Sequence, residues 1–508
     1  MIDVLVINPG NRKKTFQNLG EKYAAIETPY WVVAIASYLR INNFSVAIID
    51  QDVEALSAKE VALKVKEIHP KLVAIVAHGS TPQSSTLNMF YVNELANEIK
   101  GNIDSKIAVS GIHVTAMPEN TLLNKNIDFV IIGEGPIALK NLIKNLDSNK
   151  IHLKNSPGLC FYDDDGTIIK NEAAPLIQNL DQTLHTAAWD LIPMKEYRSH
   201  FWHSFHDLKN TKPYAAIYTA LGCQYNCSFC QINTLFGKPG MRFRSPENVV
   251  NEIGLLVEKY NIKNLKIADE LFVYDENHYM KIINMLIERK YNLNIWCWSR
   301  VDSVKIENLD KMKKAGINWL VYGIESADFN VRREIGKPIR PNVEEIVKVT
   351  RNHGISVVAN YIFGLPEDNL ETMQKNYDQA VDINAEVANF YAAQAYPGTR
   401  LYKTALKQNW ELPSEWSGYS HHSYDCKPVS TKYLTAEEVL AFRDKAFHEY
   451  HTTEKYLSMI KSKFGESAVN FMNEITSIKL DRQILGGSFE NYWKTNLKDK
   501  NFFSNNLK

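Results

Sequence analysis

The stretch Leu221–Ile232 reads LGCQYNCSFCQI and places Cys223, Cys227 and Cys230 at spacings of four and three residues. It contains half of the six cysteines in the chain. Three thiols this close cannot all pair into well-formed disulfides, but they can surround one inorganic centre. Iron–sulfur clusters are held by cysteine thiolates at short spacings, usually by four of them. A four-iron cluster on this loop would therefore leave one iron without a nearby protein ligand, open to another molecule.

Two alternatives to a cluster remain for this loop, a zinc site and buried thiols without a metal. A structural zinc site normally takes a second pair of Cys or His ligands. The other cysteines, Cys160, Cys297 and Cys426, are isolated from one another, and no His-x3–5-His pair follows the loop. The spacing therefore favours an iron–sulfur cluster over both alternatives.

The composition of the 508 residues is that of an ordinary globular protein of two to four domains, with 45% hydrophobic and 23% charged residues. Lys+Arg and Asp+Glu both total 58, so we expect no nucleic-acid partner, which usually requires a basic excess. No run of about 18 apolar residues and no secretory pattern is present. We expect no membrane span and a cytoplasmic location, where thiols stay reduced and available as ligands.

The region 1–150 alternates short β-branched runs with amphipathic stretches. We expect strands at Val4–Asn8, Ser45–Asp50, Leu72–Ala77, Lys106–Ser110 and Phe129–Ile132. We expect helices at Tyr30–Ile41, Ala58–Ile68, Ser85–Ile99 and Ile137–Leu146. This alternation predicts an α/β domain with a doubly wound parallel sheet and right-handed crossovers. In such sheets ligands bind beyond the carboxyl ends of the strands.

Glycine follows four of the five predicted strands of this sheet. These strand ends include Gly10, Gly79, Gly111, and the pair Gly133 and Gly135. Glycine has no Cβ and lets a bulky ligand approach the backbone, although each one also suits an ordinary turn. A dinucleotide site would need G-x-G-x-x-G after the first strand, and the sequence NPGNRKKT lacks it. NAD is therefore not expected.

The rest of the chain is expected to contain three further regions. Residues 151–212 are a predicted connector, with a hairpin from Gly158 to Ile169 and buried aromatic residues that pack between domains. Residues 213–406 repeat the strand–helix unit six times, too few for an eight-fold barrel. The strands are expected at Ala215–Ala220, Asn264–Ala268, Asn294–Trp298, Asn318–Gly323, Ser356–Phe363 and Val387–Ala393. Residues 407–508 are expected to be mostly helical, at Ala436–Glu449 and Ala468–Leu485.

The cysteine loop, with Phe229 directly before its last cysteine, resembles the radical S-adenosylmethionine (SAM) superfamily. A sheet domain before the cluster domain, with SGIHVTAMPE at 110–119 and DFVIIGEGPIAL at 128–139, is similar to its cobalamin-binding class. The resemblance implies an open six-unit barrel and a [4Fe–4S] cluster whose open iron chelates SAM. An electron would cleave SAM to a 5′-deoxyadenosyl radical, with cobalamin held above the cluster. It also implies a small-molecule substrate and an external electron donor such as flavodoxin or ferredoxin.

The resemblance also implies SAM-binding residues at the strand ends of the barrel. Glu270, with Asp269 as the alternative, would receive the ammonium group of SAM. Ser299 and Arg300 would face its ribose and carboxylate, because a guanidinium suits a carboxylate. The remaining residues are Phe229, Glu325, Ser326, Gly364 and Pro366. For each residue an ordinary structural role, as a salt bridge, a turn or an apolar anchor, is the alternative.

Cobalamin would lie at the glycine-rich edge of the first sheet. The residues implied there are Gly79, Gly111, His113, Gly133, Glu134 and Gly135. The motif D-x-H-x-x-G, which supplies an axial histidine to cobalt in other cobalamin proteins, is absent. His78 and His113 lie at strand ends, either as ligands or as ordinary loop histidines. The axial ligand of cobalt therefore stays unassigned.

The sequence favours a cobalamin-dependent radical SAM methyltransferase that transfers a methyl group to an unactivated carbon of a small molecule or of a lipid or sugar precursor. A radical SAM cyclase or rearrangement enzyme is one alternative, and a non-catalytic cobalamin or metal carrier is another. A tRNA methylthiotransferase is excluded, because that family has a second cysteine triad near its N-terminus and this chain has no cysteine before Cys160. No catalytic residue is identified, although Tyr396, Trp416, His421 and His422 are candidates for a substrate pocket.

Overall fold

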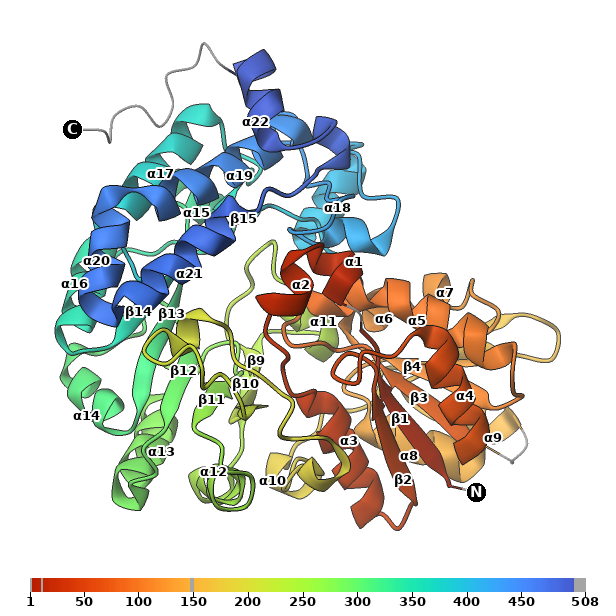
Figure 1. The fold of residues 1–508 in the computed structure, drawn as a ribbon. Coiled ribbons are helices and arrows are strands. Elements are labelled where there is room, and N and C mark those ends of the chain that lie inside the picture. Colours follow the sequence, from red (N-terminus) through yellow and green to blue (C-terminus); the bar gives the residue numbers. More distant parts are fainter. Residues whose placement is uncertain (1, 11, 147–149, 498–508) are drawn as a thin grey trace.

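The computed structural model describes residues 2–10, 12–146 and 150–497. Two α/β domains lie side by side, and a helical C-terminal extension covers the second of them (Figure 1). The first domain is built on a seven-stranded sheet and the second on a six-stranded sheet. The fold class predicted from the sequence is therefore confirmed.

The first sheet has the strand order β2-β1-β3-β4-β5-β6-β7. Its parallel strands are β1 (Val4–Asn8), β2 (Val46–Asp50), β3 (Leu72–Val76), β4 (Lys106–Ser110) and β5 (Phe129–Ile131). Successive strands add on opposite sides of β1, so the winding direction reverses between β1 and β3. That point of an open parallel sheet is where crevices for ligands form.

Helices cover both faces of this sheet, because its strands are apolar on both sides. Val4 and Val6 share a core with α3 (Tyr30–Ile41) and α8 (Pro136–Asn145). Leu5 and Ile7 share a second core with α4 (Ala58–Ile68) and α5 (Ser84–Lys100). Side chains alternate along a strand, so one run of five residues serves both cores.

The hairpin predicted within the connector belongs to the first sheet. Strands β6 (Leu159–Tyr162) and β7 (Ile168–Lys170) extend the sheet beyond β5 in antiparallel orientation. Cys160 pairs with Val130 and is fully buried there. The sheet is thus mostly parallel rather than wholly parallel, and it continues past residue 150.

The aromatic residues of the connector pack between the domains, as predicted. The Tyr197 hydroxyl donates to Asp50 at the end of β2, at 2.7 Å. The Trp189 indole donates to Glu252 of α12 (Pro246–Tyr260), at 3.0 Å. These two bonds join the connector to the first sheet on one side and to α12 of the second domain on the other.

The second sheet is parallel and open, with the order β15-β14-β13-β12-β11-β8. Its strands are β8 (Tyr214–Ile217), β11 (Asn264–Ile267), β12 (Asn294–Ser299), β13 (Ile317–Glu325), β14 (Ser356–Phe363) and β15 (Val387–Ala392). The outer helices are α12, α13 (Glu276–Arg289), α14 (Leu309–Lys314), α16 (Val343–Asn352) and α17 (Leu370–Ile383). Six strands with two unpaired edges form the partial barrel that the sequence predicts.

The first strand of this barrel ends earlier than expected. It stops at Ile217, and the chain turns into β9 (Ala220–Cys223), which pairs antiparallel with β10 (Gly240–Phe243). The turn is held by Thr219, whose backbone N–H and hydroxyl both donate to the Asp269 carboxylate. The cysteine loop therefore starts from a hairpin that leaves the barrel, not from a barrel strand.

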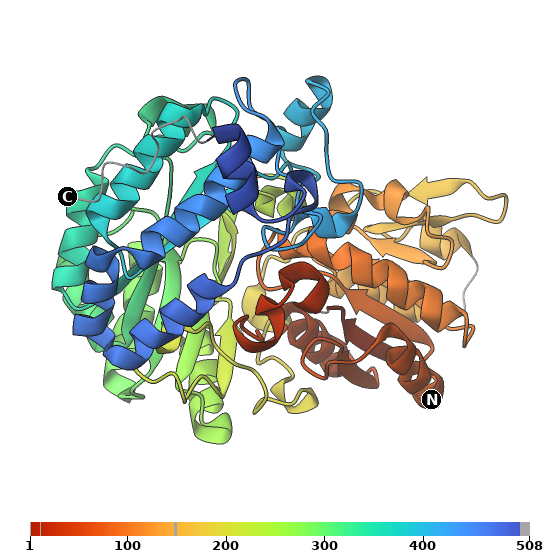
Figure 2. The same ribbon diagram turned by 45° about the horizontal axis from the view of Figure 1, so that its top comes forward.

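The C-terminal extension contains α19 (Ala436–Thr452), α20 (Glu454–Phe464) and α21 (Glu466–Ser477), drawn in blue in Figure 2. Helix α19 contacts α17 and β15, and α20 and α21 pack against α19 and each other. Helix α20 was not predicted. A buried carboxylate, Asp444, accepts hydrogen bonds from Arg443 and Arg482 and joins α19 to the segment after α21. Residues 498–508, the end of the predicted C-terminal region, lie outside the described residues. No helix within the described ranges is long and apolar enough to cross a membrane.

Candidate active site between the two sheets

The cysteine loop is fixed to its surroundings through its backbone. Cys223 is the last residue of β9 and pairs with Gly240. The Ser228 N–H donates to Ile335 O, and Ser228 O accepts from the Leu401 N–H, both at 2.9 Å. Cys230 N–H donates to Cys227 O at 3.2 Å, just before α11 (Ile232–Phe236) begins. The structure thus places the three cysteines on one anchored turn.

Burial raises the thiol pKa of all three cysteines, for Cys223 to about 11. Bound metal would instead favour the thiolate form that ligation requires. The positive charges of Lys337 and Arg300 lower the thiol pKa of Cys227, so they also favour its thiolate form. Lys337 was not found from the sequence, since an isolated lysine in a loop has no motif to mark it.

The arrangement of these thiols does not suit a single ion. Within the described residues no group of three or more His, Cys, Asp or Glu side chains is placed to hold one metal ion. A zinc site needs its ligands around one centre, whereas the thiolates of a four-iron cluster bind separate irons and stand further apart. The donor type present on this turn, cysteine thiolate, is the one that iron–sulfur clusters use.

Arg300 lies beside the cysteine loop at the end of β12. Its guanidinium binds Asp302 through two hydrogen bonds, at 2.7 and 2.8 Å, and lies 3.9 Å from the ring centroid of Tyr225. Its Nη1 is buried and has no partner among the described residues. Ser299 is buried next to it and donates to Arg300 O. One edge of the guanidinium is therefore positioned by protein and another remains free for a ligand.

Glu325 ends β13 in the left-handed region, at φ 68°. Its carboxylate accepts a hydrogen bond from Lys337 at 2.6 Å, and both side chains are buried. The Asn376 amide donates to Glu325 O at 3.0 Å, while Ser326 is fully buried. This strand end is rigid before any ligand arrives, and part of the charge of Glu325 is already compensated.

The adjacent carboxylates Asp269 and Glu270 have different surroundings, as expected from their alternation. Asp269 is buried and bound to Thr219. Glu270 instead lines a cavity between the domains, where burial raises the pKa of its carboxyl to about 8. Of the two, Glu270 is the residue that faces open space.

The remaining predicted SAM-binding residues contact protein. A Cβ on Gly364 would lie 2.4 Å from Val439 of α19, and φ there is +78°. Phe229 packs on an apolar cluster that contains Leu365 and Leu401. Pro366 O accepts from the Lys432 N–H. These contacts connect the fifth strand end to the C-terminal extension.

The glycines of the first sheet form two groups. A Cβ on Gly79 or Gly111 would collide with neighbouring atoms, 2.4 Å from the Ser84 Cβ and 2.6 Å from the Ala77 carbonyl oxygen. Gly133, at φ +94°, has no neighbour within 4 Å of that position, and Gly135 has only van der Waals contacts. The first group is therefore explained by tight packing, and Gly133 leaves open space.

Glu134 joins the two domains. Its carboxylate accepts two hydrogen bonds from Arg242 of β10, at 2.8 and 3.1 Å, and a third from the Ile177 N–H at 2.7 Å. His113 is buried beside Thr86, with 3.2 Å between Nδ1 and Oγ1, and its ring lies edge-on to Trp416. Trp416 of the C-terminal region thus reaches the first sheet.

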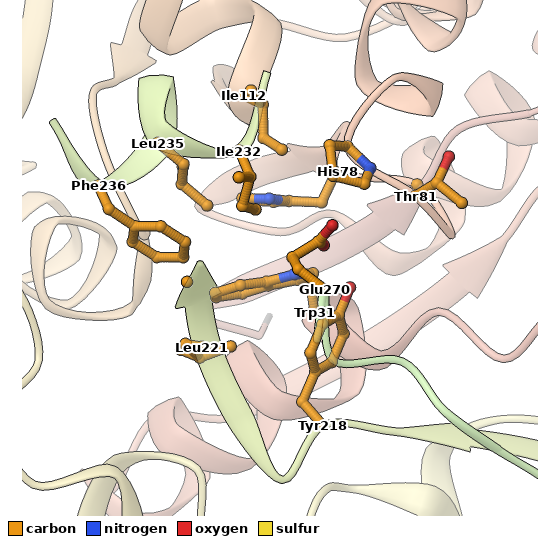
Figure 3. Close-up of a pocket in the computed structure, with 13 residues that line it drawn as sticks. Trp31, His78, Thr81, Ile112, Tyr218, Leu221, Ile232, Leu235, Phe236 and Glu270 are labelled. Carbon is orange, nitrogen blue, oxygen red and sulfur yellow. The ribbon is translucent and has the colours of Figure 1, made fainter. Parts of the chain in front are cut away.

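A narrow cavity separates the end of β3 from the cysteine hairpin (Figure 3). His78 and Trp31 from the first domain lie one above the other on one side, and Ile232, Leu235 and Phe236 of α11 lie opposite. The free space is about 10 Å³, room for about one water molecule. Lys266 of β11 crosses between the domains and donates to Ser80 O at 3.0 Å.

Two protein families match the chain, one for each α/β domain. The B12 binding domain matches residues 18–143, and the radical SAM superfamily matches residues 217–380. An uncharacterised methyltransferase of Pyrococcus horikoshii is 29% identical over 84% of this chain and 89% of its own length. The anaerobic magnesium-protoporphyrin IX monomethyl ester cyclase of Rubrivivax gelatinosus is 25% identical over 79% of this chain and 69% of its own length.

The fold is also that of a solved structure. The cobalamin-dependent SAM radical enzyme OxsB, with aqua-cobalamin and SAM bound, aligns with a TM-score of 0.68 at 16% identity. The alignment covers 94% of this chain and 71% of that one. The match to both domain families, in this order, identifies the chain as a cobalamin-dependent radical SAM enzyme, whose cofactors are a [4Fe–4S] cluster, SAM and cobalamin.

Proposed function

We propose that this enzyme methylates an unactivated carbon of a small molecule or of a lipid or sugar precursor. The observation that carries the proposal is the cavity where the glycine-rich edge of the first sheet faces the hairpin of the cysteine loop. A radical made on one side and a methyl carrier on the other would then meet at one substrate. The relative from Pyrococcus horikoshii bears the name of a methyltransferase.

In this proposal the cluster is held by the three thiolates, Cys223, Cys227 and Cys230. SAM lies across the barrel mouth, where Glu270 and the free edge of Arg300 suit its ammonium and carboxylate groups. Glu325 and Ser326, with Ser299, Gly364, Pro366 and Phe229, form the rest of that site. The open side of the first sheet, around Gly79, Gly111, His113, Gly133, Glu134 and Gly135, receives cobalamin.

The regions proposed with this function are residues 1–150 with the added hairpin β6–β7 for cobalamin, 213–406 for the cluster and SAM, and 407–508 for the substrate side. A corrin ring is far larger than the cavity in Figure 3. Cobalamin binding at this edge therefore requires that lining side chains rotate or that the domain faces separate. The α11 side chains Ile232, Leu235 and Phe236 are the lining side chains that would move.

The reaction balances with two molecules of SAM for each methylation. One gives 5′-deoxyadenosine, which has taken a hydrogen atom from the substrate, and methionine. The other gives S-adenosylhomocysteine, and its methyl group replaces the substrate hydrogen. Two electrons come from an external donor such as flavodoxin or ferredoxin. Cobalamin, when bound, supplies a carrier for the methyl group.

Isotope-labelled SAM tests the proposal. The reconstituted, reduced holoenzyme is given candidate substrates with SAM that carries a ¹³C-labelled methyl group, and products are read by mass spectrometry. We expect the label in the product together with both 5′-deoxyadenosine and S-adenosylhomocysteine. An unlabelled product with 5′-deoxyadenosine alone would contradict methylation.

That contradicting result would favour the second candidate, a cyclisation or rearrangement. The cyclase of Rubrivivax gelatinosus supports this candidate, because it matches a similar share of the chain. A holoenzyme that never cleaves SAM would point instead to a cobalamin or metal carrier. The ordered strand ends of the barrel, above all Glu325 with Lys337, argue against a carrier.

A further inference from the structure

Helix α18 (Arg400–Lys407) begins directly against the cysteine turn. The Leu401 N–H donates to Ser228 O at 2.9 Å. The Arg400 guanidinium donates to Asn226 O at 2.6 Å. The first turn of the helix is therefore bonded to the residues on either side of the second cysteine of the loop.

The cysteine turn reaches the surface of the molecule on the side of α18. Asn226 and Arg400 are both exposed. A Cβ on Gly336 would lie 3.1 Å from Arg400 Nη2, 3.3 Å from Asn226 O and 3.9 Å from the Cys227 Cα. The residues packed on the outside of Cys227 are thus a glycine and an exposed arginine, so the path from solvent to this cysteine is short.

The outer face of α18 carries three cations and no carboxylate. Arg400, Lys403 and Lys407 are exposed at spacings of three and four residues, which places them on one side of the helix. Within the described ranges none of the three is ion-paired. The sequence has no Asp or Glu from 387 to 410, and the next acid, Glu411, is already paired with Lys427. This face therefore presents uncompensated positive charge to solvent.

The stability of the helix does not explain this charge. Cations are unfavourable near the N-terminus of a helix, where the backbone dipole is positive, yet Arg400 and Lys403 occupy the first turn and no acidic residue does. Leu406, between Lys403 and Lys407 on the helix surface, is 54% exposed. An apolar side chain with charged neighbours is typical of a surface that binds another protein. The face of α18 therefore suits a partner of opposite charge.

We propose that the outer face of α18 is the docking site of a small acidic one-electron carrier protein of the flavodoxin kind. The carrier loses one electron and the cluster on the cysteine turn gains it, so the step balances. Opposite charges orient the carrier and speed its encounter with the enzyme. The bonds from Arg400 and Leu401 keep the docking face beside the cysteine turn. The inference rests on the cluster position in the proposed function but not on cobalamin or methyl transfer.

Two matched charge reversals test this surface in the reconstituted holoenzyme. Lys403→Glu with Lys407→Glu reverses the face and keeps Arg400, which holds the cysteine turn. Lys311→Glu with Lys314→Glu reverses two exposed lysines of α14, at the amino end of β13 and thus at the other end of the barrel. Calorimetry measures the binding of an acidic flavodoxin at low and high salt. The formation of 5′-deoxyadenosine is measured with reduced flavodoxin and with reduced methyl viologen, a small chemical donor.

We expect the α18 reversal to weaken flavodoxin binding and to slow flavodoxin-driven SAM cleavage by about 10-fold or more at low salt, and by less at high salt. The α14 reversal should change neither, and both variants should cleave SAM at the wild-type rate with methyl viologen.

Equal effects of the two reversals, no effect of the α18 reversal, or no binding of flavodoxin to the wild-type enzyme would overturn the proposal. So would a loss of cleavage with both donors, because it would show a disturbed cysteine turn. A holoenzyme that forms no methylated product would contradict the proposed function, whereas a loss of flavodoxin binding confined to the α18 reversal would still support the docking site.

Discussion

The two sheets present their carboxyl ends to one cavity, but they are prepared differently. At the barrel edge, charged groups are already paired, as Glu325 with Lys337 and Arg300 with Asp302. At the edge of the first sheet, His78 and Ser110 bury side-chain atoms that have no partner among the described residues. The barrel edge is therefore largely built in the absence of a ligand, with Arg300 Nη1 left free, whereas the first sheet buries unpaired atoms of His78 and Ser110.

Removal of a cysteine thiol should give the largest loss of activity. It also tests whether the two sheet edges bind their cofactors independently. Changes to residues around a metal site cost about 10–100-fold in affinity or activity, so loss of a ligand should exceed that. We expect Cys227→Ala to lose cluster iron and SAM cleavage while still binding cobalamin. Iron content, cluster absorbance and 5′-deoxyadenosine formation measure this. Cys160→Ala on β6 is the control and should keep all three; loss of cobalamin in Cys227→Ala would show that the edges are not independent.

Breaking the buried pair at the barrel edge should give the next largest effect. Lys337→Met leaves the Glu325 carboxylate buried without its cation, which costs about 3–5 kcal/mol of unfolding free energy. Urea unfolding of the cofactor-free protein measures it. Adding Glu325→Gln should restore much of the loss. Lys432→Met removes an exposed pair with Glu367 and should cost at most about 1 kcal/mol; equal losses at the two sites would contradict a pre-built edge.

Substitution of one glycine at each sheet edge should give a smaller loss of stability. Gly364→Ala places a methyl group against Val439 at positive φ, so overpacking and strain together should cost about 2–4 kcal/mol. Gly133→Ala meets no neighbour and should cost only about 1 kcal/mol, from φ alone. Thermal unfolding measures both. For cobalamin affinity the order should reverse, since only Gly133 borders the proposed cofactor space.

The smallest effect should come from the ionisation of Glu270. Its folded-state pKa of about 8 lies above the ordinary value of 4.5, so the folded protein binds the extra proton between these values. Stability should therefore fall as the pH rises from about 5 to 8, by about 1–2 kcal/mol after allowance for solvent screening. Glu270→Gln should remove this slope in the cofactor-free protein. Parallel curves for the two proteins would show that the carboxyl is not in a cavity that disfavours its charge.

The regular elements could be predicted because their patterns are local. The bounds of β1, β4, β14, α3 and α4 agree with the periodicity of apolar residues. The break between β8 and β9 could not be, because it depends on Asp269 binding Thr219 from fifty residues away. Helix α20 was missed because α19 and α20 follow one another with only Thr453 between them.

The site could be predicted only in part, for the same reason. The cysteine spacing is a local signal. The partners of Glu325 and Glu134, namely Lys337 and Arg242, are chosen by tertiary contacts and carry no motif. The buried state of His78 and its stack on Trp31 likewise join segments 47 residues apart (78 − 31). The sequence thus indicates which strand ends form the candidate site. It does not indicate which of their polar atoms are left without a protein partner.

The contact between Glu134 and Arg242 also holds the edge of the first sheet at a short distance from the cysteine loop. On β10, Arg242 lies two residues from Gly240, which is paired with Cys223. Two residues of extended chain span about 7 Å, so a single short tether links the edge of the first sheet to the start of the cysteine loop. Shortening this tether with Glu134→Asp would change the separation between the edge of the first sheet and the cysteine loop while leaving the three thiols in place. The spacing of the two domains at this point thus depends on a contact that the loss of one methylene group would alter.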